Sequence, residues 1–246
     1  MYKTLSFIVP KRIFNRMSSV DVAALRIKYL EKKEVFREDS IEKKDPIFLF
    51  KKWLDEAITN EELLEPNGMC LATVSKAGLP SARFVLLKSV EERGFTFFTN
   101  YGSRKAQDMS ENPNVAATFY WLPLRRQVRI EGTVDKISRE ESEKYFHSRP
   151  RSSQIGAVAS PQSEVIPSRE YLDDIESEIK GKLGDNEEVP MPNWGGYLIT
   201  PKVIEFWQGQ TNRLHDRIQF RKSNEDVDGK LVHRAENGWV MERLAP

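Results

Sequence analysis

One stretch of the chain gathers many groups that can donate hydrogen bonds. Residues 207–217, WQGQTNRLHDR, hold two arginines, a histidine, a tryptophan, two glutamines and an asparagine. This polar corner lies between two segments with strand character, residues 196–207 and 218–221. A donor-rich loop between strands can bind an anionic ligand. A surface turn with solvated arginines fits this composition equally well.

Further cations lie beside the ends of predicted elements. Arg83 and Lys88 share one predicted strand, and their separation lets both face one side only if a bulge or the strand end intervenes. Arg104 and Lys105 open a predicted helix after Ser103, where free backbone N–H groups and the helix dipole favour a phosphate. The remaining cations of this set are Arg149, Arg213 and Arg217. Ser153 follows closely after Arg149. Singly, each is most often a solvated surface group, but together they indicate two phosphate groups to be held.

Other kinds of site are not indicated. The chain has no dinucleotide fingerprint, P-loop, HExxH, CxxC or G-x-S-x-G motif. Its histidines, His147, His215 and His233, are scattered, so no metal site is predicted. His215 and Asp216 are neighbours, and on an extended chain they would point to opposite faces, which argues against a catalytic dyad. The single cysteine, Cys70, lies in an apolar run and is predicted to be a buried structural thiol of a reducing compartment.

Length and composition narrow the class of protein. The 246 residues allow one large or two small domains of an ordinary soluble protein. Because the formal net charge is only +1, the sequence does not predict a broad basic surface for binding nucleic acid. No apolar run approaches the roughly 20 residues that span a bilayer. We therefore expect neither a nucleic acid nor a membrane partner.

The first 44 residues are expected to lie outside the main domain. Residues 1–20 carry basic side chains and no acid, which suits a mitochondrial presequence, although a tail with translation starting at Met17 fits equally well. Residues 21–44 read as a basic helical arm and linker, in which Asp21 can cap the helix. Residues 45–246 are predicted to form a single domain in a cytoplasmic protein.

Alternation and turn signals predict a protein that is mainly β with helices. Asp45 and Pro46 begin a helix, Ser138 begins a capping box, and Ser168 caps another helix. Further helices follow Ser103 and Ser152. Predicted strands cover residues 69–74, 81–90, 95–99, 115–121, 127–137, 196–207, 218–221 and 239–244, the last closing a hairpin that turns at 226–230. Short strands at this density favour a barrel or sandwich over a doubly wound sheet.

The polar corner and the C-terminal ERLAP (242–246) resemble the signature of the pyridoxamine 5'-phosphate oxidase family. The resemblance runs in order through roughly residues 20–246. It is carried by PSAR (80–83), LLK (86–88), FFTN (97–100), SRK (103–105), QVR (127–129), YFHSRP (145–150) and SSQIGA (152–157). It departs from the family at Leu30 and Lys33, where the family prefers arginines.

This resemblance implies a Greek-key, FMN-binding split β-barrel that forms a homodimer, with FMN at the subunit interface and each site drawing on both chains. The residues implied to bind FMN are Arg83, Phe84, Val85, Leu86, Phe98, Thr99, Arg104, Lys105, Gln127, Gln162, Ser163, Trp207 and Arg217. Those implied to bind substrate are Lys88, Tyr145, Arg149, Ser153, Arg213, Leu214 and His215, with Arg26 and Tyr29 in an arm that closes over it.

The implied reaction is oxidation of pyridoxamine 5'-phosphate or pyridoxine 5'-phosphate by O2 to pyridoxal 5'-phosphate. Hydride passes from substrate C4' to flavin N5, H2O2 is released, and the amine also yields ammonia. Arg213 and His215 are the implied catalytic residues, and alternation on an extended segment would put them on one face with Leu214 turned away. Two other functions are kept as alternatives: a split-barrel flavin reductase or carrier, and a protein that binds or delivers pyridoxal phosphate.

Overall fold

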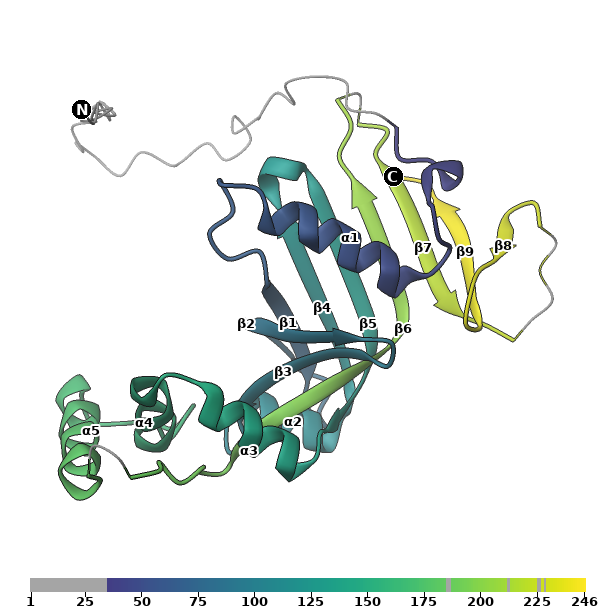
Figure 1. Cartoon of the computed structure of the whole chain (residues 1–246). Coiled ribbons are helices and arrows are strands. Elements are labelled where there is room, and N and C mark those ends of the chain that lie inside the picture. Colours follow the sequence, from purple (N-terminus) through teal and green to yellow (C-terminus); the bar gives the residue numbers. More distant parts are fainter. Residues whose placement is uncertain (1–34, 185–186, 212, 225–226, 228) are drawn as a thin grey trace, which may run out of the picture.

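An antiparallel β-sheet carries most of the fold (Figure 1). The computed structural model describes residues 35–184, 187–211, 213–224, 227 and 229–246. The predictions made for residues 1–20, Arg26 and Tyr29 therefore concern residues outside the described part of the chain. The strands are β1 (Gly68–Val74), β2 (Pro80–Glu91), β3 (Gly94–Asn100), β4 (Asn114–Trp121), β5 (Arg126–Lys136), β6 (Trp194–Gln208), β7 (Asp216–Lys222), β8 (Val232–Arg234) and β9 (Trp239–Leu244).

Six of these strands close into a barrel. They follow the order β3-β2-β1-β4-β5-β6, and pairing of β3 with β6 joins the two ends. The chain passes from β3 across to β4 beside β1, which is the Greek-key connection. The long strand β6 pairs with β3 near Trp194 and with β7 near Gln208. Strands β7, β9 and β8 thus extend the sheet beyond the barrel, and the expectation of a split barrel is confirmed.

Helix α1 (Pro46–Ile58) packs an aromatic face against the barrel strands. Asp45 caps it as expected, because its carboxylate accepts hydrogen bonds from the backbone N–H groups of Ile47 and Phe48. Phe50 is fully buried, with its ring 4.9 Å from that of Phe95 and 5.1 Å from that of Phe119. Edge-on aromatic contacts of this kind add to the burial of apolar area.

A bulge interrupts strand β2 at Lys88. Leu87 lies opposite Phe97, whereas Ser89 lies opposite Thr96, so Lys88 is the extra residue. The bulge shifts the alternation of side chains along β2. It therefore lets Arg83 and Lys88 line the same cavity although they are five residues apart. A bulge was one of the two ways in which the sequence allowed these side chains to share a side.

The other helices lie between β3 and β6 in the chain. They are α2 (Arg104–Glu111), α3 (Arg139–Ser148), α4 (Arg151–Ala159) and α5 (Arg169–Lys182), and short 3-10 turns cover Glu38–Ser40 and Leu122–Leu124. Ser138 forms the predicted capping box with Glu141, and Ser168 accepts a hydrogen bond from the N–H of Tyr171. Pro150 separates α3 from α4. Helices α3, α4 and α5 gather at one end of the molecule (Figure 1).

Two expectations from the sequence are wrong. The hairpin that β9 closes turns at 235–238, where Asn237 and Gly238 both have positive φ, and not at the predicted 226–230, of which residues 226 and 228 lie outside the described part of the chain. Asn-Gly is a favoured dipeptide in such turns because both residues tolerate this conformation. Cys70 is half-buried, because alternation along β1 puts Met69 and Leu71 in the core and Cys70 on the outer face.

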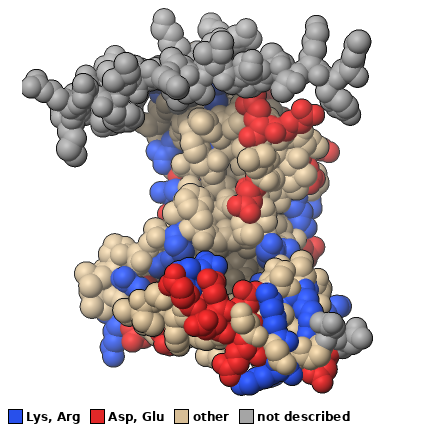
Figure 2. All heavy atoms as spheres, turned by 90° about the vertical axis from the view of Figure 1, so that its left-hand side faces the viewer, with Lys and Arg blue, Asp and Glu red and all other residues tan. Residues whose placement is uncertain are grey.

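Some features of the surface bear on possible partners. Acidic and basic side chains lie interspersed on the face that carries α4 and α5 (Figure 2). Among the described residues, no helix is both long and apolar enough to cross a membrane. That same part of the chain contains no cluster of three or more His, Cys, Asp or Glu residues able to hold a metal ion.

Candidate functional site

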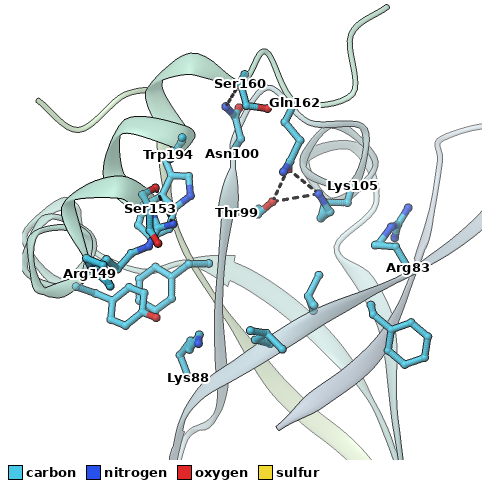
Figure 3. Close-up of a pocket in the computed structure, with 18 residues that line it drawn as sticks. Arg83, Lys88, Thr99, Asn100, Lys105, Arg149, Ser153, Ser160, Gln162 and Trp194 are labelled. Atoms are coloured by element: carbon cyan, nitrogen blue, oxygen red, sulfur yellow. Dashed lines mark hydrogen bonds between the residues drawn. The ribbon is translucent and has the colours of Figure 1, made fainter. Parts of the chain in front are cut away.

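A cavity of about 660 Å³ opens where α3 and α4 approach β2 and β3. Cations lie at two of its ends, Lys105 with Arg83 at one and Arg149 with Lys88 at the other, and Trp194 lies on the side of Arg149 (Figure 3). Its lining consists of Arg83, Phe84, Val85, Leu86, Lys88, Phe98, Thr99, Asn100, Lys105, Tyr145, Arg149, Pro150, Ser153, Gly156, Ala157, Ser160, Gln162 and Trp194. Twelve of these are residues predicted to bind a cofactor or substrate, so the structure brings together a large part of the predicted site.

Lys105 forms the first cationic end. Only 9% of its surface is exposed, and its ammonium group donates to Thr99 Oγ1 at 3.1 Å, Ser103 Oγ at 3.3 Å and Gln162 Oε1 at 2.8 Å (Figure 3). Burial, with a smaller contribution from the nearby charge of Arg83, lowers the pKa of Lys105 to about 8. All three acceptors are neutral, so an anion bound here would stabilise the charged ammonium group.

The guanidinium group of Arg83 is held beside this end by neighbouring strands. It donates to Thr73 Oγ1 at 2.7 Å, to the Leu71 carbonyl at 3.2 Å and to Ser81 Oγ at 2.9 Å. The carboxylate of Asp108 lies 3.9 Å away. Burial nevertheless lowers the pKa of Arg83. The guanidinium group of Arg83 is thus held in one position, and the carboxylate of Asp108 on α2 balances part of its charge.

Arg149 forms the second cationic end, with Lys88 nearby (Figure 3). Its Nη2 donates to the Ser153 carbonyl at 3.0 Å, and its guanidinium group lies 4.9 Å from the ring centre of Trp194. Its Nη1 is buried and has no hydrogen-bond partner in the structure, and burial lowers the pKa of this arginine. A buried guanidinium donor without a partner indicates that a bound anion supplies the acceptor.

Three stacked aromatic rings line the cavity between α3 and β6. Phe98 stacks on Tyr145 with ring centres 3.9 Å apart and on Trp194 at 5.2 Å. Trp194 was not among the predicted site residues, although its place directly before two glycines was a signal. A Cβ on Gly196 would lie 2.9 Å from Phe98 Cε1 and 2.4 Å from Ile137 Cδ1. The stack therefore requires glycine at this position.

The polar corner does not share this cavity. Gln127, Trp207 and Arg217 lie in one row across β5, β6 and β7. Trp207 is 13 residues along β6 from Trp194, which corresponds to at most about 43 Å of extended strand at roughly 3.3 Å per residue. No residue of the corner lines the cavity of the same chain.

The corner is a turn and not an extended segment. Gln208 pairs with Asp216 in an antiparallel ladder, so the residues between them must reverse the chain. Arg213 accordingly has a φ of 63°, in the left-handed region. The expectation that alternation puts Arg213 and His215 on one face, with Leu214 turned away, is therefore wrong. The ring of His215 lies 4.8 Å from that of Trp207, and Arg213 and Leu214 are among the exposed residues here.

Comparison with known proteins decides the family. Residues 54–180 match the family model described as pyridoxamine 5'-phosphate oxidase. Residues 194–246 match the pyridoxine 5'-phosphate oxidase C-terminal dimerisation region. The chain belongs to the pyridoxamine 5'-phosphate oxidase family. This membership makes it an oxidoreductase.

Relatives support the assignment over nearly the whole chain. The chain is 54% identical over 241 residues to the pyridoxine/pyridoxamine 5'-phosphate oxidase of Bombyx mori, covering 96% of this chain and 94% of the relative. It is 49% identical over 240 residues to the pyridoxine-5'-phosphate oxidase of Bos taurus, covering 96% and 92%. The crystal structure of PhzG from Burkholderia lata 383 with tetrahydrophenazine-1-carboxylic acid has a TM-score of 0.75 and 27% identity, covering 87% and 99%.

Some residues implied by the resemblance to the pyridoxamine 5'-phosphate oxidase family lie apart from the cavity. Arg104 is exposed at the start of α2, and Ser163 is exposed with a φ of 76° beside Gln162. Arg217 pairs with the buried carboxylate of Glu205 at 2.8 and 3.1 Å, and the hydrogen bond to Glu205 raises the pKa of Arg217. The chain of this oxidase family thus carries two separate sets of candidate residues, one in the cavity and one at the corner.

Proposed function

We propose that this chain oxidises pyridoxamine 5'-phosphate and pyridoxine 5'-phosphate to pyridoxal 5'-phosphate, using FMN and O2. The observation that carries this proposal is one cavity that holds two cationic ends and an aromatic stack. FMN and a phosphorylated B6 vitamer each bring one phosphate, which matches two separate cationic ends. The names of the relatives from Bombyx mori and Bos taurus support the same substrates.

The Lys105 end fits the phosphate of FMN. Its ammonium group is buried among neutral acceptors, and charge-assisted hydrogen bonds to phosphate are among the stronger polar contacts in proteins. Arg83, Thr99 and Gln162 would hold the cofactor with it. Bound FMN would supply the acceptor for the hydride that leaves substrate C4', and O2 would carry the electrons away as H2O2.

The Arg149 end fits the phosphate of the substrate. The unpartnered Nη1 of Arg149 needs an acceptor, and Lys88 adds a second cation beside it. The hydroxyl groups of Tyr145 and Ser153 lie on the same lining and can donate to phosphate oxygens. This end would therefore fix the substrate by its phosphate and leave the ring to face the flavin.

A homodimer would bring the two sets of residues together. The match of residues 194–246 to a dimerisation region supports this assembly. In such a dimer, the polar corner of one copy would complete the cavity of the other, with Gln127, Trp207 and Arg217 toward FMN and Arg213, Leu214 and His215 toward substrate. No residue of the corner lines the cavity of its own chain, which supports completion of the site by a second copy.

The first test uses purified protein. We expect a yellow dimer with one FMN per chain that releases H2O2 when it is given pyridoxine 5'-phosphate. A flavin reductase or carrier would bind FMN but produce no peroxide from this substrate. A protein that only delivers pyridoxal phosphate would bind the product without turnover, and either result would overturn the proposal.

The second test mixes two impaired variants. Arg149→Ala damages the cavity, and Arg213→Leu damages the corner. If each site combines one cavity with the corner of the other chain, a heterodimer of these variants contains one doubly damaged site and one intact site. We expect the isolated heterodimer to have about half the parental kcat/KM, while both homodimers keep only a few per cent of it or less. A heterodimer as impaired as the two homodimers would show that the corner serves the cavity of its own chain.

A further inference from the structure

Asp216 joins three segments that lie far apart in the sequence. It is 5% exposed at the start of β7. Its Oδ2 accepts hydrogen bonds from the backbone N–H of Phe36 at 3.1 Å and from Gln210 Nε2 at 2.8 Å. Its Oδ1 pairs with Arg243 Nη1 at 2.8 Å. One carboxylate thus ties the N-terminal residues, the polar corner and β9 together.

The N-terminal partner is a short strap, residues 35–40, held against the C-terminal strand. Arg243 donates to the Phe36 carbonyl at 2.8 Å and forms two hydrogen bonds with Glu38, at 2.6 and 3.0 Å. The hydrogen bonds to Glu38 raise the pKa of Arg243, and those from Arg243 lower the pKa of Glu38. The ring of Phe36 lies 5.2 Å from that of Trp53 on α1. The strap is therefore attached through Arg243 and Asp216 together.

The partner in the polar corner is Gln210, which in turn holds His215. Gln210 is buried, and its backbone N–H donates to Nδ1 of His215 at 2.9 Å. A backbone N–H can only donate, so Nδ1 is the acceptor and the neutral imidazole carries its proton on Nε2. The side chain of Gln210 is fixed by Asp216, so a chain of contacts runs from the strap through Asp216 and Gln210 to the imidazole.

We propose that Asp216 is a positioning residue that couples attachment of the strap to the state of His215. By holding Gln210, it keeps His215 in the Nε2–H form, which can donate a hydrogen bond from the face presented to substrate. Coupling between two sites is reciprocal, so loosening the strap must also disturb the imidazole. This inference rests on the proposed function, in which His215 contacts the substrate.

A purely structural role for Asp216 makes a different prediction. In that case the carboxylate only neutralises Arg243, and a change confined to the strap would leave the imidazole as it was. Glu38→Gln is such a change, because Glu38 contacts Arg243 and not the corner. The matched control is Glu242→Gln on the same strand as Arg243, since Glu242 accepts hydrogen bonds from Gln219 and Arg221.

The experiment uses the FMN-loaded full chain and measures three properties of Asp216→Asn, Glu38→Gln and Glu242→Gln. Ring nitrogen NMR shifts report the tautomer of His215, whose signal is assigned by its loss in His215→Gln. The rate of trypsin cleavage after Arg37 reports attachment of the strap. Steady-state oxidation of pyridoxine 5'-phosphate gives kcat and KM, and the flavin spectrum confirms loading.

We expect both Asp216→Asn and Glu38→Gln to speed cleavage after Arg37 and to mix the two tautomers of His215. We expect kcat/KM to fall about 5-fold or more in each variant, a typical size for coupling between sites. Glu242→Gln should leave all three properties unchanged. If Asp216→Asn does not fold, Glu38→Gln alone decides the question, because it keeps the Asp216 contacts.

An unchanged His215 spectrum in Glu38→Gln, together with faster cleavage after Arg37, would overturn the coupling. Failure of the proposed function would look different, because the parental protein would then not oxidise pyridoxine 5'-phosphate. The NMR and trypsin measurements would still decide whether the strap and His215 are coupled.

Discussion

The ammonium group of Lys105 lies 2.8 Å from the side-chain oxygen of Gln162, which a loop 57 residues further along the chain supplies. Both groups also contact the hydroxyl of Thr99 on β3. A lysine held by neutral oxygens keeps its full positive charge available to a ligand, so the cofactor end of the cavity is preorganised for an anion.

Removal of this charge should weaken FMN binding. We expect Lys105→Met to raise the Kd for FMN about 10- to 100-fold, the usual range for loss of a charge-assisted hydrogen bond. Arg104→Ala should have a smaller effect, because Arg104 is exposed and does not line the cavity. Fluorescence titration of the apoprotein with FMN measures both. Equal affinities in the parent and Lys105→Met would place the phosphate elsewhere.

The same lysine should make FMN binding depend on pH. Burial lowers its pKa from 10.5 to about 8 in the protein without ligand, so it is charged below pH 8 and loses its proton above that. Binding of an anion then requires uptake of one proton, and affinity should fall by about 10-fold per pH unit above pH 8. Lys105→Met should lack this dependence, whereas Lys51→Met, on the exposed face of α1, should retain it.

Arg149→Ala should act mainly on substrate binding. Loss of a guanidinium contact to phosphate should raise KM for pyridoxine 5'-phosphate about 10- to 100-fold, with a smaller change in kcat. Arg151→Ala is the matched control, since Arg151 donates to the carbonyls of Gly184 and Glu187 and does not line the cavity. A KM that rises equally in the two variants would indicate a general effect on α4.

Arg213→Leu should damage turnover while FMN stays bound. The proposed role of Arg213 is to cover the substrate ring in the cavity of a second copy. Misplacement of a reacting group by about 1 Å can cost roughly 100-fold, so we expect kcat/KM to fall by at least that factor. Steady-state kinetics after spectroscopic confirmation of full FMN loading gives the answer. Parental kcat/KM would remove the polar corner from the substrate site.

Gly196→Ala should destabilise the protein, because the new Cβ would overlap Ile137 and Phe98. Overpacking of a core typically costs about 1–3 kcal/mol. Gly181→Ala in α5 meets nothing within 4 Å and should instead stabilise the helix by about 0.5–1 kcal/mol. Urea unfolding of both variants measures the two effects, and an equally stable Gly196→Ala would show that the aromatic stack can shift.

The sequence predicts best those features that depend on neighbouring residues. Asp45 and Ser138 cap their helices because the relevant N–H groups are two or three residues away, and the strands end within two residues of the predicted bounds. For Arg83 and Lys88 to share a side, the sequence required either a bulge or the strand end, and the structure has a bulge at Lys88. Motif resemblance then brought together much of the cavity.

The sequence did not predict features set by distant partners. The conformation of Arg213 depends on the pairing of β6 with β7, which forces the chain to reverse. The role of Trp194 depends on its stacking with Phe98, which comes from another strand. The contacts of Asp216 join residues up to 180 positions apart. Contacts between residues so far apart leave no pattern among neighbouring residues of the sequence. Only the three-dimensional structure reveals these contacts.

Strand β6 fills the gap between β3 and β5, and this has a consequence for synthesis on the ribosome. Until residues 194–208 have emerged, the nascent sheet has two open edges, because β3 and β5 both find their remaining partner in β6. Open strand edges pair readily with other chains. The growing polypeptide is therefore at greatest risk of aggregation just before β6 appears, when the cavity also still lacks Trp194 from the same late strand.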